Sequence, residues 1–417
     1  MQKKVAIIGS GISGLYAAYK LSQNNVVTLY EKENYIGGHT RTINVIENKR
    51  KIPIDTGFIV YNLINYPNFS EMLKELKVKS FKSNMSFAIS GIKDEYKLST
   101  LSTVFANKKN IFNFKYYKLI YEIIKFNSEA LNMINKNVNT KINLRNYLRK
   151  HNYTEFFIKG YIVPMGSSIW SCNEDEILNY PLVSYIQFMN NHGLLSIGEQ
   201  LQWYSIEKGS NSYVSKMLNK NNFTVKKCHK VSKILRKNNK VKVFSKNKSN
   251  IYDACFICTH SNSALKLLGN SATSAEINYL KEFEYSNNSV CLHTDASVMP
   301  KNKKCWASWV YKANKYNRPL VSYWMNNLQK INSKKNYFVS LNSEKLINDD
   351  LMVNKTILQH PVFNYKTKLL QRDVGLIQGI GNIYYAGAYL GNGFHEDGIN
   401  ASIYAMKYYR RYQNENY

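Results

Sequence analysis

Short apolar runs and glycine-rich turns alternate over the first sixty residues. An apolar run at 5–8 precedes a glycine turn and a stretch at 15–21 whose spacing fits a helix, and a second apolar run follows at 26–30. Strand, helix and strand in this order predict a parallel βαβ arrangement. We expect two such strand–helix units, followed by a further strand over residues 52–60.

The middle of the chain has a different pattern. Apolar positions from about 70 to 200 recur mostly at helical spacing, whereas the runs from 223 to 258 and from 287 to 345 are strand-like. A strand at 383–386 and a helix at 400–409 close the chain. Similar segments at both ends with different ones between them predict an α/β fold, α+β overall, with two interleaved domains. We expect a Rossmann-like dinucleotide-binding domain from residues 1–70, 200–286 and 366–417, and a mixed α/β substrate domain from residues 71–199 and 287–365.

One helical segment, residues 114–131, is amphipathic with a basic side. Its apolar residues at helical spacing are Tyr117, Ile120, Ile124 and Leu131, and lysines occupy other positions, Lys115, Lys118 and Lys125. Such a helix usually covers a core with its apolar side. A lipid-facing surface is the alternative interpretation.

The turn after the first apolar run carries the pattern G-x-G-x-x-G, formed by Gly9, Gly11 and Gly14. In this pattern the first glycine makes the tight turn, the second lets a pyrophosphate approach, and the third lets helix and strand pack closely. The helix N-terminus attracts the phosphates. Glu31 ends the second strand at the spacing of a carboxylate that holds a ribose hydroxyl. Together these features predict a bound dinucleotide.

The net charge of +29 is the main anomaly of composition, and Lys supplies most of it. Codon bias towards A·T is the first explanation, attraction to an anionic membrane surface the second, and nucleic acid a distant third, because scattered Lys lacks the forked contacts of Arg. A hydrophobic fraction of 44% is that of a folded globular protein. No run is long enough to span a membrane, and glycines interrupt the N-terminal apolar stretch, so it does not read as a signal peptide. We expect a cytoplasmic protein, with peripheral attachment at the inner face of the cytoplasmic membrane if the membrane interpretation holds.

Six cysteines are spread along the chain, and two of them form the C-x-x-C pair Cys255 and Cys258. This pair lies in an apolar, strand-like run. Positions i and i+3 of a strand point to opposite faces, so the two thiols are badly placed for a shared metal or a disulfide. We interpret all six as structural thiols and expect no metal.

Two further elements accompany the first loop. A glycine pair, Gly37 and Gly38, follows the second strand and leads into His39, Thr40 and Arg41. Near the end, residues 386–402 form a glycine-rich segment that runs into the closing helix. A glycine pair leaves room for the backbone to pass under a cofactor, and a helix N-terminus can stabilise negative charge on a bound group.

The three elements in this order resemble the flavin amine oxidase superfamily, which includes protoporphyrinogen oxidases and carotenoid desaturases. His39 stands where the usual Arg follows the glycine pair, which makes Arg41 the expected phosphate partner. Further motifs, at 55–60, 66–69, 164–166, 169–171, 191–195 and 393–398, resemble a bacterial branch of predicted NAD/FAD-binding proteins. That branch is similar to the flavin desaturase of furan fatty acid synthesis, which dehydrogenates a methyl-branched unsaturated acyl chain on membrane phospholipid.

The resemblance implies an amine oxidase-like architecture and an FAD-dependent oxidoreductase that desaturates a lipid or other apolar substrate. We expect no nucleic-acid partner, because the sequence offers no basic helix with base-reading residues. The absence of a Cys near residues 386–402 favours non-covalent FAD. An amine oxidase, a carotenoid- or porphyrinogen-type oxidase and a non-catalytic flavin-binding partner stay open as alternatives, as does the oligomeric state. The expected catalytic residues are His395 as base or proton relay, with Glu396, and His192 as a second candidate. The expected cofactor contacts are Gly9, Gly11, Ser13, Gly14, Glu31, Lys32, Gly37, Gly38, His39, Thr40, Arg41, Gly57, Phe58, Val231, Gly387, Ala388, Gly393, Phe394, His395, Glu396, Asp397, Gly398, Ile399 and Ala401.

Overall fold

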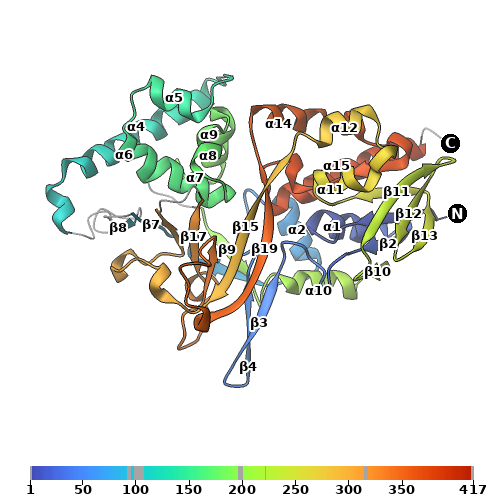
Figure 1. The fold of residues 1–417 in the computed structure, drawn as a ribbon, viewed down its shortest axis with the longest axis horizontal. Helices are drawn as coiled ribbons and strands as arrows, with labels where there is room; N and C mark the ends of the chain where they lie inside the picture. The colour runs from blue at the N-terminus through green and yellow to red at the C-terminus, as the bar shows by residue number, and fades with distance from the viewer. Residues whose placement is uncertain are drawn as a thin grey trace.

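A five-stranded parallel sheet organises one half of the molecule (Figure 1). The computed structural model describes residues 2–91, 95–97, 108–138, 140–195, 201–220, 222–313 and 318–414. The strands run in the order β10-β2-β1-β14-β20, so the chain builds outward from β1 on one side and then crosses to the other. Their bounds are β1 Lys4–Ile8, β2 Val26–Tyr30, β10 Thr224–Lys226, β14 Ala254–Ile257 and β20 Ile383–Tyr385.

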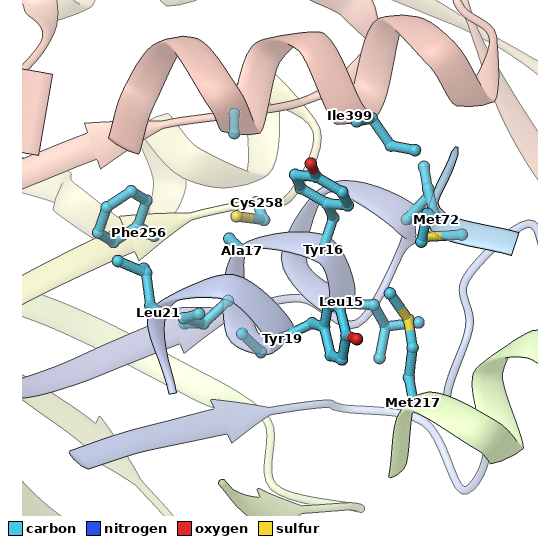
Figure 2. Close-up of a cluster of buried hydrophobic side chains, with 14 of the residues drawn as sticks. Leu15, Tyr16, Ala17, Tyr19, Leu21, Met72, Met217, Phe256, Cys258 and Ile399 are labelled. Carbon is cyan, nitrogen blue, oxygen red and sulfur yellow. The ribbon is translucent and has the colours of Figure 1, made fainter. Parts of the chain in front are cut away.

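Alternate residues of these strands point to two separate cores. Val5 and Ile7 face one core, which helices α1, α2, α10 and α15 cover, whereas Ala6 and Ile8 face the other. Figure 2 shows side chains of α1 lying between the sheet residues near Phe256 and residues of the other helices, such as Met72 and Ile399. The helix bounds are α1 Ile12–Leu21, α2 Pro67–Glu75, α10 Asn211–Asn219 and α15 His395–Asn414.

The opposite face of the parallel sheet carries an antiparallel meander and two helices. The meander is inserted between β10 and β14, and its apolar residues pack with those of the helices against Ala6, Ile8 and Cys255. The two faces are thus both buried, as a parallel sheet requires. These elements are β11 Val231–Lys237, β12 Lys240–Ser245, β13 Lys248–Tyr252, α11 Ser261–Leu268 and α12 Ser274–Leu280.

A seven-stranded mixed sheet forms the centre of the second half, in the order β19-β15-β18-β17-β16-β7-β8. Its two longest strands, β15 and β19, pair antiparallel from Glu284 and Val362 to His293 and Met352, and they run as a long ribbon through the middle of the molecule (Figure 1). The bounds are β7 Phe87–Ser90, β8 Glu95–Lys97, β15 Glu284–His293, β16 Trp309–Lys312, β17 Leu320–Trp324, β18 Phe338–Leu341 and β19 Met352–Val362.

Helices between residues 114 and 191 form a cap beside this sheet (Figure 1). Their shared core is strongly aromatic and includes Phe126, Phe157, Trp170, Tyr185 and Phe188. The helices are α4 Phe114–Asn135, α5 Leu144–Lys150, α6 Glu155–Phe157, α7 Val163–Trp170, α8 Glu174–Leu178 and α9 Leu182–Asn191. Short elements complete the fold: the hairpin β3 Thr42–Glu47 and β4 Arg50–Asp55, the small sheet of β5 Tyr61–Asn62, β9 Trp203–Ile206 and β6 Ser80–Ser83, and the helices α13 Met325–Leu328 and α14 Tyr365–Leu370.

The α/β fold with a Rossmann-like sheet is confirmed, but several element predictions are wrong. The second strand–helix unit is absent, because residues 31–41 form a loop that leads into the β3–β4 hairpin. The strand expected over 52–60 ends at Asp55. Strands β6, β7 and β8 lie in a region expected to be mostly helical. All three are short; β6 and β7 pair with the distant strands β9 and β16, and β8 pairs with β7 at the edge of the sheet. The domain boundaries stay a prediction, and the parallel strands all fall inside the segments assigned to the dinucleotide-binding domain.

The two C-x-x-C thiols point to opposite faces of the parallel sheet as predicted: Cys255 on β14 lies in the core of the meander, and Cys258, just after β14, lies in the core of α1. All six cysteines are free thiols, and burial raises the pKa of Cys291 to about 11. Across the described residues no cluster of His, Cys, Asp or Glu could hold a metal. Nor does any described helix combine the length and apolarity needed to cross a membrane.

Candidate functional site: a dinucleotide cradle beside an apolar cavity

The G-x-G-x-x-G loop lies at the carboxyl end of β1, where the strand order reverses, which is the usual ligand position in an open α/β sheet. Gly9 has φ +100°, and a Cβ atom at Gly14 would lie 1.9 Å from the carbonyl oxygen of Gly9. A Cβ atom at Gly11 would meet nothing within 4 Å. The fold of the protein therefore requires glycine at positions 9 and 14. At Gly11, by contrast, a side chain would meet no protein atom, and the backbone borders open space.

Helix α1 begins without a capping side chain and without an acidic residue in its first turn. Its first N–H groups have no acceptor within the helix, and the helix dipole adds positive potential at this end. An anionic group placed in the space beside Gly11 would be stabilised there.

The carboxylate of Glu31 ties this loop to the glycine pair. It accepts hydrogen bonds from the backbone N and the Oγ of Ser10, at 3.0 and 2.6 Å, and the same Oγ accepts from Gly37 N at 3.2 Å. A Cβ atom at Gly38 would lie 3.0 Å from the Cα of Gly11, so the two glycine loops touch backbone to backbone. The predicted first and second cofactor elements thus form one rigid unit.

The third element joins them through α15. A Cβ atom at Gly398 would lie 2.7 Å from Ile12 Cγ2 and 2.8 Å from Ser13 Oγ, and Ser402 Oγ donates to Ser13 O at 2.8 Å. Ile399 and Ala401 are buried in this helix contact. The structure therefore brings the three predicted elements together at one place.

His395 begins α15 and is buried against the glycine-pair loop. Its Nε2 lies 2.9 Å from Thr40 Oγ1 and 3.3 Å from Tyr213 OH, and its ring stacks on Phe58 at 3.6 Å between centroids. Burial, together with the nearby His39, lowers the pKa of His395 well below its ordinary value. His395 is consequently a neutral, anchored imidazole, and its part in proton transfer stays a prediction.

The two carboxylates after His395 serve the fold around the site. Glu396 accepts from the backbone N of Asn68 and Phe69, at 3.0 and 2.9 Å, and so caps the N-terminus of α2. Asp397 accepts from Phe394 N at 2.9 Å, and burial raises its pKa to about 6. These contacts give Glu396 a structural role that the sequence pattern did not indicate.

Half-buried Lys368, on α14, holds the loop in front of Asp397. Its Nζ donates to Gly391 O at 2.9 Å and to Asn392 Oδ1 at 2.8 Å, and it lies 4.3 Å from the centroid of the Phe363 ring. Burial lowers the pKa of Lys368 to about 8, while Asp397 opposes this shift.

The remaining expected cofactor residues occupy different environments. Arg41 is satisfied by protein partners, since it donates to Thr56 Oγ1 at 3.0 Å and to Asn354 Oδ1 at 2.9 Å. Lys32 is largely exposed and pairs with Glu33 at 3.4 Å. Val231 is buried at the start of the meander, and Gly387 and Ala388 follow β20 at the carboxyl edge of the sheet.

We call the three assembled elements, residues 9–14, 37–41 and 393–402, the cradle. An apolar cavity of about 250 Å³ opens beside it. It extends from Gly57, Phe58, Gly393 and His395 on the dinucleotide side to the cap helices α7 and α9 and to strands β7, β16 and β17. None of the described residues that line it is Asp or Glu. Its aromatic and large apolar lining residues are Phe58, Ile59, Val60, Tyr66, Met85, Phe87, Met165, Ile169, Trp170, Phe188, Leu194, Trp203, Trp309, Tyr323, Phe363 and Phe394.

His192 lines this cavity at the end of α9 and has a defined tautomer. Its Nδ1 lies 2.9 Å from the carbonyl oxygen of Phe188, which can only accept, so Nδ1 carries the hydrogen and Nε2 is a bare acceptor. The ring stacks on Phe188 at 3.8 Å, and burial lowers the pKa of His192 to about 4. At neutral pH His192 is therefore a neutral imidazole with an unprotonated Nε2.

Three further imidazoles cluster at the dinucleotide end, and two of them were not singled out in the sequence. The His39 ring lies 5.4 Å from that of His360 and 6.3 Å from that of His260. Strand β19 supplies His360, and the segment after β14 supplies His260. Burial and the neighbouring imidazoles lower the pKa values of His260 and His360 to about 4 and about 3, so both are neutral.

The hydrogen bonds of this cluster define which nitrogens are donors. Asn288 Oδ1 accepts from Asn342, so Asn288 Nδ2 donates to His360 Nδ1 at 3.0 Å and leaves the hydrogen on Nε2. Gln359 Nε2 donates to Asn287, so Gln359 Oε1 accepts from His260 Nδ1 at 3.2 Å. No local motif marks His260 or His360, since the tertiary fold alone brings them to His39.

Comparison with known proteins supports this description of the fold. Residues 7–76 match the family of NAD(P)-binding Rossmann-like domains, a span that contains the first loop, Glu31 and the glycine pair. No curated protein matches the chain by sequence. Solved structures match over almost the whole chain at low identity, and they show the fold alone.

Three of these structures illustrate the likeness. A protein assigned as a protoporphyrinogen oxidase from Exiguobacterium sp. 255-15 has a TM-score of 0.70 at 13% identity, with 98% of each chain covered. The CLA-producing fatty acid isomerase from P. acnes has 0.69 at 12%, covering 97% of this chain and 98% of that one. Cyclohexylamine oxidase from Brevibacterium oxydans IH-35A has 0.67 at 12%, covering 99% and 100%. The amine oxidase-like architecture predicted from the motifs is thereby confirmed.

Proposed function

We propose that this chain is an FAD-dependent oxidoreductase that desaturates an apolar substrate, a methyl-branched unsaturated fatty acyl chain of membrane phospholipid. The observation that carries the proposal is the apolar cavity that adjoins the dinucleotide cradle at Phe58 and His395. A long acyl chain fits an aromatic and aliphatic lining, and burying it there is favourable by about 0.8 kcal/mol for each CH₂ group.

The cradle fits a flavin dinucleotide. The uncapped start of α1 and the open space at Gly11 suit a pyrophosphate, and the Glu31 carboxylate lies within the same loop unit for a ribose hydroxyl. His360, whose Nε2 carries the hydrogen, and Gly393 line the cavity. The non-covalent attachment of FAD is part of the proposal.

FAD, when bound, would supply the acceptor for the two electrons and one hydrogen that leave the acyl chain as hydride. The second hydrogen leaves the neighbouring carbon as a proton, and His192 Nε2 takes it. The hydrogen bond from Nδ1 to Phe188 holds the imidazole in the tautomer that this transfer needs. His395, anchored by Thr40 and stacked on Phe58, positions the wall between cradle and cavity.

An amine oxidase is the second candidate, and the likeness to cyclohexylamine oxidase favours it. The lining argues against a cationic amine, because the described cavity residues offer no carboxylate to pair with an ammonium group. A neutral amine would still be compatible with the aromatic walls.

Anaerobic mixing of FAD-loaded protein with phospholipid vesicles that carry methyl-branched monounsaturated chains tests the proposal. We expect the visible flavin absorption to bleach and a conjugated diene to appear in the extracted lipid. Bleaching with a panel of neutral amines but not with lipid would replace the desaturase by an amine oxidase. A protein that binds no FAD would overturn both functions, and bound FAD that no substrate reduces would favour a non-catalytic flavin-binding partner.

A further inference from the structure

Helix α4 belongs to the cap, and it carries an apolar stripe on the side that faces away from the core of the cap. We name Phe112, Phe114, Tyr117, Tyr121 and Ile124 the α4 stripe. All five side chains are exposed, and Phe112 and Phe114 are exposed to 87% and 88%. Large apolar residues at i, i+3, i+7 and i+10 lie on one face of a helix, so the last four form a continuous row.

The exposed position of this row corrects the sequence interpretation of residues 114–131. Tyr117 and Ile124 were expected to cover a core, but the buried side of α4 consists instead of residues such as Tyr116, Leu119 and Phe126. These three fill the aromatic core of the cap, so the neighbouring row is left on the outside. The helix therefore has apolar residues on two sides: one side fills the core of the cap, and the other, which includes Tyr117 and Tyr121, is exposed.

Lysines border the exposed row. Lys115 and Lys118 are exposed, and neither forms an ion pair with any residue that the structure describes. An apolar row edged by lysines is complementary to an anionic lipid surface, where aromatic rings enter the acyl boundary and ammonium groups reach phosphates. Two copies of the same face would instead bring four ammonium groups together.

We propose that the α4 stripe, with Lys115 and Lys118, is the surface by which the protein docks on an anionic phospholipid bilayer. The docking is peripheral, because the stripe covers only the first turns of one helix and the short turn before it. The proposal is independent of the reaction, and it also gives one physical use for part of the net charge of +29.

Vesicle co-sedimentation of the full, FAD-loaded protein tests this surface. We expect binding to vesicles that contain phosphatidylglycerol and at least about tenfold weaker binding to pure phosphatidylcholine vesicles. The double variants F112S/F114S and K115E/K118E should each weaken binding to the anionic vesicles at least about tenfold.

Matched controls distinguish binding through the stripe from non-specific hydrophobic or electrostatic binding to vesicles. L376S removes an exposed apolar side chain elsewhere, and K246E/K248E reverses two exposed lysines in the meander. Both control variants should bind as the unmodified protein does. An equal loss in K246E/K248E, or unchanged binding in both stripe variants, would overturn the proposal.

Hydrogen exchange of the unmodified protein supplies a readout that needs no variant. Anionic vesicles should slow amide exchange at residues 111–124 relative to protein alone, and a lack of protection there would count against docking. Analytical ultracentrifugation tests the alternative that a second copy of the chain binds the stripe. If the protein were a dimer that F112S/F114S converts to a monomer, the stripe would be a contact between two copies.

Discussion

The dinucleotide cradle and the helical cap are built by different kinds of contact. In the cradle, backbone meets backbone: Gly14 lies against Gly9, Gly38 against Gly11, and Gly57 against His39. In the cap, large aromatic side chains such as Phe126 and Trp170 fill a shared core. A backbone contact admits only glycine, whereas an aromatic core accepts many residues of similar volume. This difference explains why the cradle can be recognised from sequence motifs, whereas the cap can be recognised only from its composition.

We expect the largest effect from a substitution at the tightest contact of the cradle. Gly14→Ala would force a Cβ atom to within 1.9 Å of the Gly9 carbonyl oxygen, and we expect a loss of about 3 kcal/mol or more in the free energy of unfolding. Gly11→Ala is the matched control, because its Cβ atom meets no protein atom within 4 Å. It should leave thermal stability of the FAD-free protein nearly unchanged and weaken FAD binding at least about tenfold, as measured by fluorescence titration. Equal stability losses in both variants would contradict this division.

A second prediction tests the chemistry on the cap side of the cavity. His192→Ala should slow anaerobic flavin reduction about 10²-fold or more, with FAD still bound, because it removes the proton acceptor. The base acts when deprotonated, and its pKa is lowered to about 4, so the reduction rate should be flat near neutral pH and fall as the pH drops towards about 4. Stopped-flow absorbance measures both effects. If His395→Ala slows reduction while His192→Ala does not, the acceptor lies in the cradle instead.

The pH dependence of stability tests whether the histidines beside the cradle are buried in the neutral state. In the folded protein the pKa values of His260 and His360 lie at about 4 and about 3, below the ordinary value of about 6.5. The unfolded chain therefore gains protons first, and stability that is complete above about pH 6.5 is lost as the pH falls, by about 1 to 2 kcal/mol per histidine near pH 5.

Urea unfolding of the FAD-free protein at several pH values checks this prediction. The variant His360→Gln should lose less stability between about pH 7 and pH 5 than the unmodified protein does. The comparison isolates the histidine, since Asp55 and Asp397, whose pKa values burial raises to about 6, act alike in both proteins. His229→Gln, at a half-buried histidine outside the cluster, is the control.

The smallest expected effect separates structure from chemistry at Glu396. Glu396→Gln leaves one acceptor where two oxygens now accept from the start of α2, so the free energy of unfolding should fall by about 1 kcal/mol. Flavin reduction by substrate should keep its rate. Calorimetry and stopped-flow measurements decide between this outcome and a slowed reaction at unchanged stability, which would make Glu396 part of the chemistry. Glu71→Gln on the exposed side of α2 is the control.

The predictable part of the molecule is the part that local patterns determine. The G-x-G-x-x-G loop, the glycine pair and the two faces of β14 could be identified because each depends on neighbours in sequence. Strand β19 could not, since it is an edge strand with many half-exposed residues and a proline at Pro361. Because β19 was not predicted, the position of His360 beside His39 could not be predicted either.

Long-range contacts account for the other omissions. Tyr213 reaches Thr40 and His395 across 173 and 182 positions of the chain, and no spacing rule links such residues. The exposed row on α4 depends on the phase of one helix: a shift of one residue decides whether Tyr116 or Tyr117 is buried. Periodicity predicted an amphipathic helix correctly, but it could not choose between two apolar sides.

The contact between α1 and α15 also affects how the protein is made. Ser13 and Ser402 meet although they lie 389 positions apart, and Gly398 rests on the first turn of α1. A nascent chain exposes the apolar side of α1 until the residues between the two helices, and then α15, have left the ribosome. Until then the cradle is open on one side, so newly made protein depends on the late docking of α15 and is vulnerable to aggregation before that step.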